Sequence, residues 1–230
     1  MHRALWLSLA VVALSSTDLI RLDSSSEGVG LPEGWTVRPV AKASTPMFSI
    51  RRDVDRKVLR VEGMKAAAWA QRELDRPIEP TAGSLDWSWR VLQLPQGADL
   101  RRADLDDAAL RLYVVFGRPD RLMARGGRII FYTWGNTEPE GLTQKSFVSD
   151  KIQIVRVAGA MEADGQWRDH RVQPFEDYRR FWNRQPPAIT AVGLMQDTDM
   201  TGGKAISEIR SLTWHPAEAP VHTGASRPPR

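Results

Sequence analysis

The sequence predicts an all-β protein, a two-sheet β-sandwich of the jelly-roll type with one short helix. Three observations lead to this fold class. Most apolar residues recur with the period of two that is typical of half-buried strands. Only one segment has a helical pattern, so the strand–helix alternation of a parallel α/β sheet is absent. No G-x-G-x-x-G or phosphate-loop sequence is present, which argues against a nucleotide-binding α/β fold.

The strands follow from alternating faces and from β-branched and aromatic content. Leu85, Trp87, Trp89 and Val91, for example, fall on one face of a single strand. The predicted strands are residues 48–52, 58–61, 66–74, 85–91, 108–116, 129–134, 152–157, 189–195 and 206–214. Residues 174–183 form the predicted helix, because Pro174 occupies its first turn and three aromatic residues give it an apolar side.

The two ends of the chain differ from this pattern. Residues 1–15 resemble a secretory signal peptide, with Arg3 before an apolar run and cleavage expected after Ser15. The run is shorter than the roughly 20 residues of a spanning helix. We therefore expect an exported protein, periplasmic or secreted, without a membrane span after cleavage. Residues 16–30 are expected to be a flexible lead-in, 31–214 a single β-sandwich domain, and 215–230 a disordered Pro-rich tail.

Composition excludes several classes of function. The 230 residues include no Cys, which removes disulfide scaffolds, thiolate metal sites and Cys nucleophiles. Only four His occur, and His170 alone lies in the predicted domain, where its charged neighbours suggest a surface position. The net charge of +4 arises from 32 Lys+Arg and 28 Asp+Glu that alternate along the chain. This pattern indicates a solvated surface and no nucleic-acid partner.

Two acidic segments, residues 104–107 and 197–203, are candidate metal or catalytic sites. Asp197 and Asp199 are two positions apart, so extended backbone would point both to the same side, where they could bind a structural calcium ion. Calcium is the one cofactor that the sequence suggests. An alternative is that these side chains cap turn amides, as Asp commonly does. A third interpretation makes Asp107 and Asp199 catalytic carboxylates.

Aromatic and arginine side chains are the candidate ligand-binding residues. Eight of the nine Trp lie outside the predicted signal peptide. Aromatic rings with a polar atom suit half-wet surfaces, on which sugar rings can stack. Trp87 and Trp89 lie on a strongly apolar face and are expected in the core. The candidates for a binding surface on the outside of a sheet are Arg111, Tyr113, Trp134 and Asn136; the alternative is that they are core or solvated residues.

Several motifs in one order resemble those of a bacterial exported family, domain of unknown function 3047. They are Leu85-Asp86-Trp87-Ser88-Trp89-Arg90-Val91, Leu94-Pro95-x-Gly97-Ala98-Asp99, the run from Asp106 to Phe116, Tyr132-x-Trp134-x-Asn136, Trp167…Asp177-Tyr178, Pro186-Pro187-x-Ile189 and Asp197-Thr198-Asp199-x-Thr201-Gly202. The resemblance covers about residues 31–214. It implies an exported, galactose-binding-like jelly roll similar to carbohydrate-binding modules, and it implies no activity. The family tends to have Asn where this chain has Met200, which would weaken a metal site that depends on that Asn.

Three functions follow from these observations. The first is an exported, non-catalytic module that binds an envelope or extracellular carbohydrate. The second is a periplasmic protein-interaction or structural module. The third is a glycan hydrolase or lyase that uses a pair of carboxylates, for which the two groups would have to flank the scissile bond.

Overall fold

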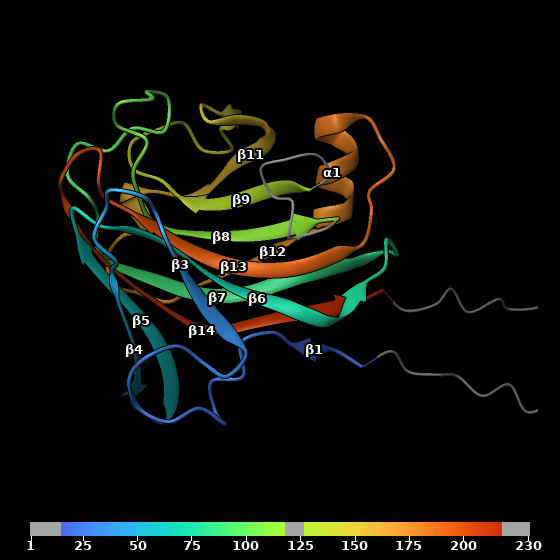
Figure 1. Ribbon diagram of the computed structural model, residues 1–230, viewed down its shortest axis with the longest axis horizontal. Coiled ribbons are helices and arrows are strands. Elements are labelled where there is room, and N and C mark those ends of the chain that lie inside the picture. The colour runs from blue at the N-terminus through green and yellow to red at the C-terminus, as the bar shows by residue number, and fades with distance from the viewer. Residues whose placement is uncertain (1–14, 118–126, 218–230) are drawn as a thin grey trace, which may run out of the picture.

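The protein is described by a computed structural model that covers residues 15–117 and 127–217 (Figure 1). These residues form fourteen strands, one α-helix and a short 3₁₀ turn at Ala160–Glu162. The strands are β1 (Thr17–Asp18), β2 (Gly28–Val29), β3 (Trp35–Pro39), β4 (Met47–Asp53), β5 (Arg56–Met64), β6 (Ala67–Ile78), β7 (Gly83–Gln93), β8 (Ala108–Phe116), β9 (Arg128–Trp134), β10 (Thr143–Ser146), β11 (Ser149–Ala158), β12 (Arg168–Val172), β13 (Ile189–Asp197) and β14 (Lys204–Pro216). The helix is α1 (Pro174–Trp182).

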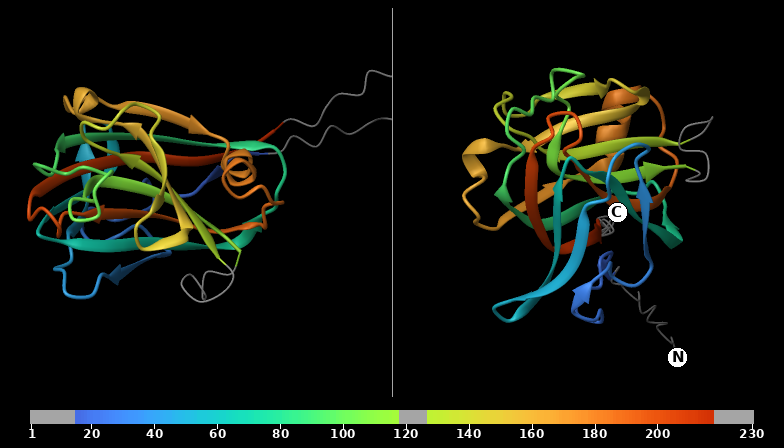
Figure 2. Two further views of the ribbon diagram at one scale, coloured as in Figure 1. Left: turned by 90° about the horizontal axis from the view of Figure 1, so that it is seen from above. Right: turned by 60° about the vertical axis from the view of Figure 1, so that its left-hand side comes forward.

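The strands form two sheets that pack face to face, with α1 at one end (Figure 2). Sheet A has the order β12-β7-β14-β5-β4-β2, with β1 paired to β14, and sheet B has the order β10-β11-β9-β8-β13-β6-β3. From β5 to β14 the chain crosses repeatedly between the sheets. Trp87 and Trp89 of β7 pack against Tyr132 and Trp134 of β9, and Gln196 of β13 donates to the Val61 carbonyl of β5, so β12-β7-β14-β5 faces β9-β8-β13-β6 in that order. This is the strand order of a jelly roll, so the predicted fold class is confirmed. One pair, β9 with β11, is parallel.

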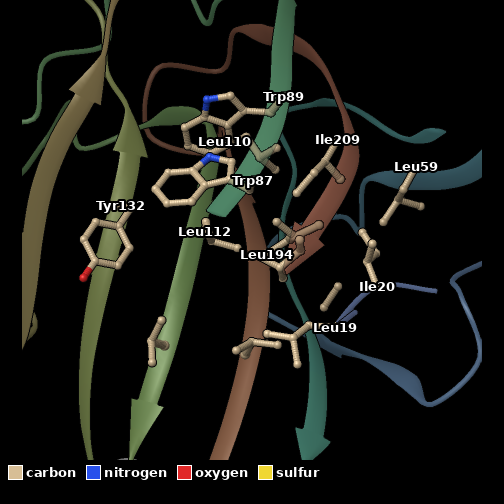
Figure 3. Close-up of a cluster of buried hydrophobic side chains, with 14 of the residues drawn as sticks. Leu19, Ile20, Leu59, Trp87, Trp89, Leu110, Leu112, Tyr132, Leu194 and Ile209 are labelled. Atoms are coloured by element: carbon tan, nitrogen blue, oxygen red, sulfur yellow. The ribbon is translucent and has the colours of Figure 1, made fainter. Parts of the chain in front are cut away.

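The main core lies between the two sheets. Trp87 and Trp89 are at most 2% exposed, and their rings meet edge to face with 5.4 Å between centroids. Figure 3 shows both rings pointing from sheet A toward Leu110, Leu112 and Tyr132 of sheet B. The prediction that these two tryptophans are core residues is therefore confirmed.

The segment expected to be a flexible lead-in is part of the fold. Thr17 and Asp18 pair with β14, and the next apolar residues, Leu19, Ile20 and Leu22, are at most 4% exposed. Burial stabilises side chains of this kind by about 1.5–3 kcal/mol each, which favours an ordered segment. The expectation that residues 16–30 are flexible is wrong. The Ser/Gly-rich stretch suggested flexibility, but the aliphatic residues that precede it are buried.

The remaining expectations concern the helix and the chain ends. The predicted helix agrees with α1 to within one residue, and Asn183 ends it in the left-handed conformation that is common after helices. The predicted signal peptide, except Ser15, and the predicted tail beyond residue 217 lie outside the described residues. In the described part of the chain, no helix is long and apolar enough to span a membrane.

Candidate functional site

Three aspartates from distant parts of the sequence meet at one end of sheet B. Asp107 lies directly before β8, Asp197 ends β13, and Asp199 follows it. The two strands pair antiparallel with Asp197 opposite Ala108, which brings these ends together. One carboxylate oxygen from each aspartate lies within 4.8 Å of the other two. The structure thus brings Asp197 and Asp199 together as the sequence suggested, and it adds Asp107 to them.

Asp107 holds the turn that follows β13. It is 1% exposed and accepts hydrogen bonds from the backbone N–H groups of Met200 (3.2 Å) and Thr201 (2.7 Å) and from the Thr201 hydroxyl (2.5 Å). Both of its oxygens are therefore engaged by the turn. The capping interpretation holds for Asp107, whose buried carboxylate accepts all three of these hydrogen bonds from the turn, while a catalytic role for it stays a prediction. A catalytic role for half-buried Asp199 stays a prediction.

Asp197 lies in an environment that disfavours its charge. Burial raises the pKa of its carboxyl group to about 8, and the nearby Asp199 and Asp107 act in the same direction while Arg111 opposes them. Its Oδ1 atom is buried without a hydrogen-bond partner among the described residues. A carboxyl group in this setting is mostly protonated at pH 7 unless a cation reaches it.

The Arg111 charge acts on Asp197, but its side chain binds Asp106 instead. It is 3% exposed and donates from Nη2 to the backbone carbonyl (2.7 Å) and the carboxylate (2.8 Å) of Asp106. Its guanidinium carbon also lies 5.5 Å from the ring centre of Phe131. Arg111 is on the outer face of sheet B as predicted, but it is covered, so the prediction that it binds a ligand is corrected.

The three carboxylates could hold a hard metal ion. Calcium binds oxygen ligands at 2.3–2.6 Å, so two ligands of one ion lie at most about 5.2 Å apart, and the three aspartates meet this limit. The unpartnered Oδ1 of Asp197 is the acceptor that a cation would satisfy. Asp197 and Asp199 would supply the main ligands, because Asp107 already accepts three hydrogen bonds. Calcium as the ion stays a prediction.

The departure at Met200 leaves these contacts intact. The Met200 side chain is 57% exposed, and only its backbone N–H contacts Asp107. Any residue except proline offers that N–H group. The side chain at this position therefore plays no part in the contacts that order the turn.

Trp134 and Asn136, predicted to bind a ligand, instead join different segments of the fold. Trp134 is 0% exposed and donates from Nε1 to the Gly159 carbonyl at 2.9 Å. Asn136 donates from Nδ2 to the carbonyls of Pro95 (3.4 Å) and Ala98 (3.2 Å). The prediction for both is corrected, because the ring has no free face and the amide donors are used within the protein.

His170 is also not the surface residue that its neighbours suggested. Its ring stacks on Trp87 with 5.3 Å between centroids and meets Trp89 edge to face. Burial lowers the pKa of the imidazole. On β12, the exposed positions are those of Asp169 and Arg171, so His170 points into the sandwich. No acid lies within salt-bridge distance of it in the described residues, which leaves it without an orienting partner for base catalysis.

Tyr113 lies on the outer face of sheet B, as predicted, but beneath other side chains. It is 0% exposed, and its ring contacts Trp69 (5.1 Å between centroids) and Phe131 (5.7 Å). Gly193 makes room for it, since a Cβ atom there would lie 2.1 Å from the tyrosine ring. Burial raises the pKa of the Tyr113 hydroxyl far above its usual value. Direct ligand binding by Tyr113 is therefore corrected to a supporting role.

Trp69 is the partly exposed member of this aromatic cluster, and no pattern in the sequence distinguishes it from the other tryptophans. It lies on β6, half-buried, against Tyr113 and Phe131, with the Phe131 ring 5.3 Å away. Its cross-strand neighbour on the edge strand β3 is Arg38. Directly opposite residues share one face of a sheet, so Arg38 and Trp69 lie on the same outer face of sheet B. Arg38 is paired with Glu73 at 3.2 Å.

A groove opens beside this pair, where β3 begins and β6 loses its neighbour. The pairing of β3 with β6 starts at Trp35 and Arg72, and the β6 residues beyond Arg72 have no partner in β3. We call this the edge groove; its volume is about 600 Å³ and its lining is Arg21, Glu33, Gly34, Thr36, Arg38, Arg72, Glu73 and Asp75. A neighbouring cleft of about 320 Å³ shares three of these residues and adds Thr17, Leu19, Leu74, Arg76 and Ile78. Figure 1 shows β3 beside β6 on the near side of sheet B.

Arg72 is the least exposed charged group of the edge groove. It is 7% exposed, and Nη1 donates to the Leu19 carbonyl at 2.9 Å. No carboxylate lies within salt-bridge distance of it among the residues that the structure describes. Burial, and then the charge of Arg21, lower the pKa of its guanidinium. Leu19 belongs to the segment expected to be flexible, which is why the sequence could not reveal this groove.

Two further clefts lie at the α1 end of the sandwich. The larger, of about 670 Å³, is lined by residues of β11, β12 and α1, including Arg171, Glu176, Asp177 and Arg180. Asp177 accepts hydrogen bonds there from the Tyr132 hydroxyl and from Arg180, both at 2.8 Å. Burial raises the pKa of the Asp177 carboxyl group. Since both oxygens are used, this carboxylate serves to attach α1 to sheet B.

Comparisons with known proteins give a family but no curated relative. A family model described as a protein of unknown function, DUF3047, matches residues 33–213. No curated protein matches the sequence.

Solved structures with a similar shape include several carbohydrate-binding modules. One is the family 11 carbohydrate-binding module of the cellulase Lic26A-Cel5E of Clostridium thermocellum, with a TM-score of 0.49, 9% identity, and coverage of 91% of this chain and 99% of that chain. Another is the CBM22-1 xylan-binding domain of Xyn10C from Paenibacillus barcinonensis, with a TM-score of 0.41, 12% identity, and coverage of 93% and 99%. A family 11 xylanase from Neocallimastix patriciarum is similar at a TM-score of 0.41, 6% identity, and coverage of 88% and 100%.

Proposed function

The chain belongs to the DUF3047 family of proteins of unknown function, and we propose that this member is an exported, non-catalytic module that binds an envelope or extracellular carbohydrate. The site is the edge groove together with the exposed part of Trp69. The observation that carries the proposal is a half-buried tryptophan that packs against two aromatic neighbours and lies opposite Arg38, a residue of the polar groove.

Trp69 has the properties of a sugar-stacking residue. Its ring is held by Tyr113 and Phe131, so little side-chain freedom would be lost when a ligand binds. Its partial exposure leaves aromatic surface for the C–H face of a sugar ring. A mobile, fully exposed tryptophan would have to be ordered first. Tyr113, predicted from the sequence to touch the ligand, contributes by fixing Trp69.

The polar groups beside Trp69 suit sugar hydroxyls. Arg38, which lies opposite Trp69 in the pairing of β3 with β6, forms an exposed ion pair with Glu73, with side chains 47% and 63% exposed. An Arg offers several N–H donors in one plane, and a carboxylate offers acceptors. Exposed pairs of this kind contribute little to stability, so they can exchange partners when a polyol arrives.

Catalysis is not part of the proposal. The common route of glycoside hydrolysis needs two carboxyl groups on either side of a bound sugar. Asp197 and Asp199 approach within 4.8 Å and share their site with Asp107, whose oxygens are occupied. None of the four clefts described above is lined by these aspartates. A role in ordering the turn after β13, with or without a metal ion, accounts for them.

Export rests on the N-terminal pattern of Arg3, the apolar run and the small residues up to Ser15. A periplasmic or secreted location would place the groove where envelope or extracellular polysaccharides occur. The test is expression in a bacterial host, followed by fractionation and N-terminal sequencing. A mature chain that begins at Ser16 supports export, and an unprocessed chain in the cytoplasm contradicts it.

The binding test is a calorimetric titration of chain 16–230 with a panel of soluble oligosaccharides, first ranked by the rise in melting temperature that each causes. Trp69→Ala should weaken binding of the best ligand by roughly 30-fold, as expected when a central aromatic contact is lost. Trp182→Ala is the matched control, because this half-buried tryptophan lies on α1. Near-ultraviolet circular dichroism verifies that both variants are folded.

The two variants separate the outcomes. Loss of binding in Trp69→Ala alone supports the edge groove. Equal binding by folded Trp69→Ala and the parent protein contradicts the site. If no carbohydrate binds the parent protein, the carbohydrate-binding proposal is wrong, and the protein-interaction alternative takes its place.

A further inference from the structure

The edge groove has a charge arrangement that goes beyond general sugar binding. We infer that it selects glycans that carry a carboxylate, one uronate group being held by Arg72 together with Arg21 and Arg76. This inference rests on the proposed carbohydrate-binding function and specifies the class of ligand.

Arg72 is the centre of the inference because it is a buried cation with unused donors. It is 7% exposed, and the one hydrogen bond that its side chain makes to the described residues goes to the Leu19 carbonyl. The guanidinium carries five N–H donors, so most of them remain for a ligand. Arg72 lines both the edge groove and the adjoining cleft, which places these donors on the path between them. Gly34 lies beside Nε, since a Cβ atom there would be 3.9 Å from it.

The charges around Arg72 leave room for one negative charge. Arg38 and Glu73 neutralise each other. Among the other lining residues, Arg21, Arg72 and Arg76 face Glu33 and Asp75, and none of these five has an ion-pair partner within 4.0 Å in the described residues. The three arginines of the lining outnumber its two carboxylates. A third acid that acts on the Arg72 charge, Asp18, lies outside the lining, where its Oδ1 accepts from the backbone N–H groups of Ile20 and Arg21. A monoanionic carboxylate matches this balance, whereas a doubly charged phosphate would be repelled by the two acids.

The geometry around Arg72 also suits a sugar acid. Planar guanidinium groups recognise carboxylates with two parallel N–H···O bonds. Leu74 and Ile78 line the adjoining cleft and offer apolar surface to a ring. Thr17 of that cleft and Thr36 of the edge groove offer hydroxyls. The edge groove and the adjoining cleft, which share Arg72, together supply an anion site, an apolar wall and neutral polar groups.

The wall formed by residues 17–21 connects the site to the fold. Leu19 is buried in the core, its carbonyl oxygen accepts from Arg72, and Arg21 is two residues further along. Arg21 has a positive φ of 48°, so this residue turns the chain beside the groove. The position of two of the three arginines therefore depends on the packing of this segment.

The experiment compares each acidic oligosaccharide with its own neutral form. Oligogalacturonate, oligoalginate and hyaluronan oligomers are titrated against the protein beside their carboxyl-reduced counterparts, at 50 mM and 300 mM salt. For at least one pair, the acid should bind about tenfold or more tightly, as expected for a charge-assisted hydrogen bond. The preference should decrease at high salt. Inorganic phosphate is included as an anion without a sugar, and it should not compete.

Variants assign any preference to the groove. Arg21→Gln and Arg76→Gln change exposed side chains and should fold normally, and each should reduce the preference for the acid while sparing the neutral form. Arg72→Gln should abolish the preference. Arg56→Gln removes the same charge at the exposed β4–β5 turn and should leave binding unchanged.

The outcomes distinguish this inference from the proposed function. Equal binding of acidic and reduced forms overturns the inference but leaves carbohydrate binding intact. A preference for the acid that survives both exposed-arginine variants also overturns it. Absence of binding by every acidic and neutral sugar overturns both. Displacement by phosphate would indicate a simple anion site and contradict a uronate site.

Discussion

Asp197→Asn should change how stability depends on pH. Asp197 has a pKa of about 8 in the folded protein, against about 3.9 for an unperturbed Asp. A raised folded pKa means that the folded state binds the proton more tightly than the unfolded state. The stabilisation is therefore fully present below about pH 4 and is lost as the pH rises toward 8. Four pKa units at about 1.36 kcal/mol each correspond to a loss of up to about 5 kcal/mol.

The substitution removes this titration and keeps the shape of the side chain. The parent protein should lose several kcal/mol of unfolding free energy between pH 4 and pH 8 relative to Asp197→Asn, measured by urea unfolding at each pH. Asp55→Asn, at the β4–β5 turn, is the control and should follow the parent curve. Parallel curves for the parent and Asp197→Asn would refute the assignment of a protonated, buried carboxyl group.

Three further predictions follow from the packing and from the acidic cluster. Gly193→Ala should destabilise by about 1–3 kcal/mol or more, because its Cβ would overlap the Tyr113 ring; an unchanged melting temperature would contradict the described outer-face packing. Leu19→Ala should lower the free energy of unfolding by about 2–5 kcal/mol. Val29→Ala, at a position 82% exposed, is the control and should change it by less than about 0.5 kcal/mol. Equally small effects of both substitutions would indicate that residues 16–30 are a flexible lead-in after all. Calcium should raise the melting temperature of the parent protein more at pH 8 than at pH 5, because ligand carboxylates must be deprotonated. It should raise the melting temperature of Asp197→Asn by less. An identical rise in the parent protein and in Asp197→Asn would exclude Asp197 as a ligand.

The sequence predicted the sandwich because its strands alternate strictly. The apolar face that contains Trp87 and Trp89 was read correctly, as was α1 with Pro174 at its start. The same period of two cannot show whether the opposite face is covered. Every position of β8 is buried, so Arg111 and Tyr113, which alternate with the core residues, are covered as well. These side chains are covered because they belong to an outer-face cluster that packs against Leu100 and other loop residues. Loops have no hydrophobic periodicity, so the sequence pattern does not predict this cover.

The candidate site shows a similar limit. The proximity of Asp197 and Asp199 could be predicted from the sequence, because residues two positions apart on a strand point to the same side. The approach of Asp107 depends on the antiparallel register of β8 and β13, which the sequence does not specify. The edge groove depends on the docking of Leu19 against the core and on the start of β3 at Trp35. A signal was present in the apolar residues from Leu19 to Leu22, but the Ser/Gly-rich stretch that follows obscured it.

The most direct test of the central claim is an NMR titration of the isotope-labelled chain with the best-binding oligosaccharide. The account predicts that the largest shift changes occur at the indole N–H of Trp69, the backbone amides of Gly34 and Thr36, and the guanidinium N–H of Arg72. Shift changes concentrated at Trp167, Trp182 or the α1 end, with these resonances unmoved, would contradict the edge groove as the binding site.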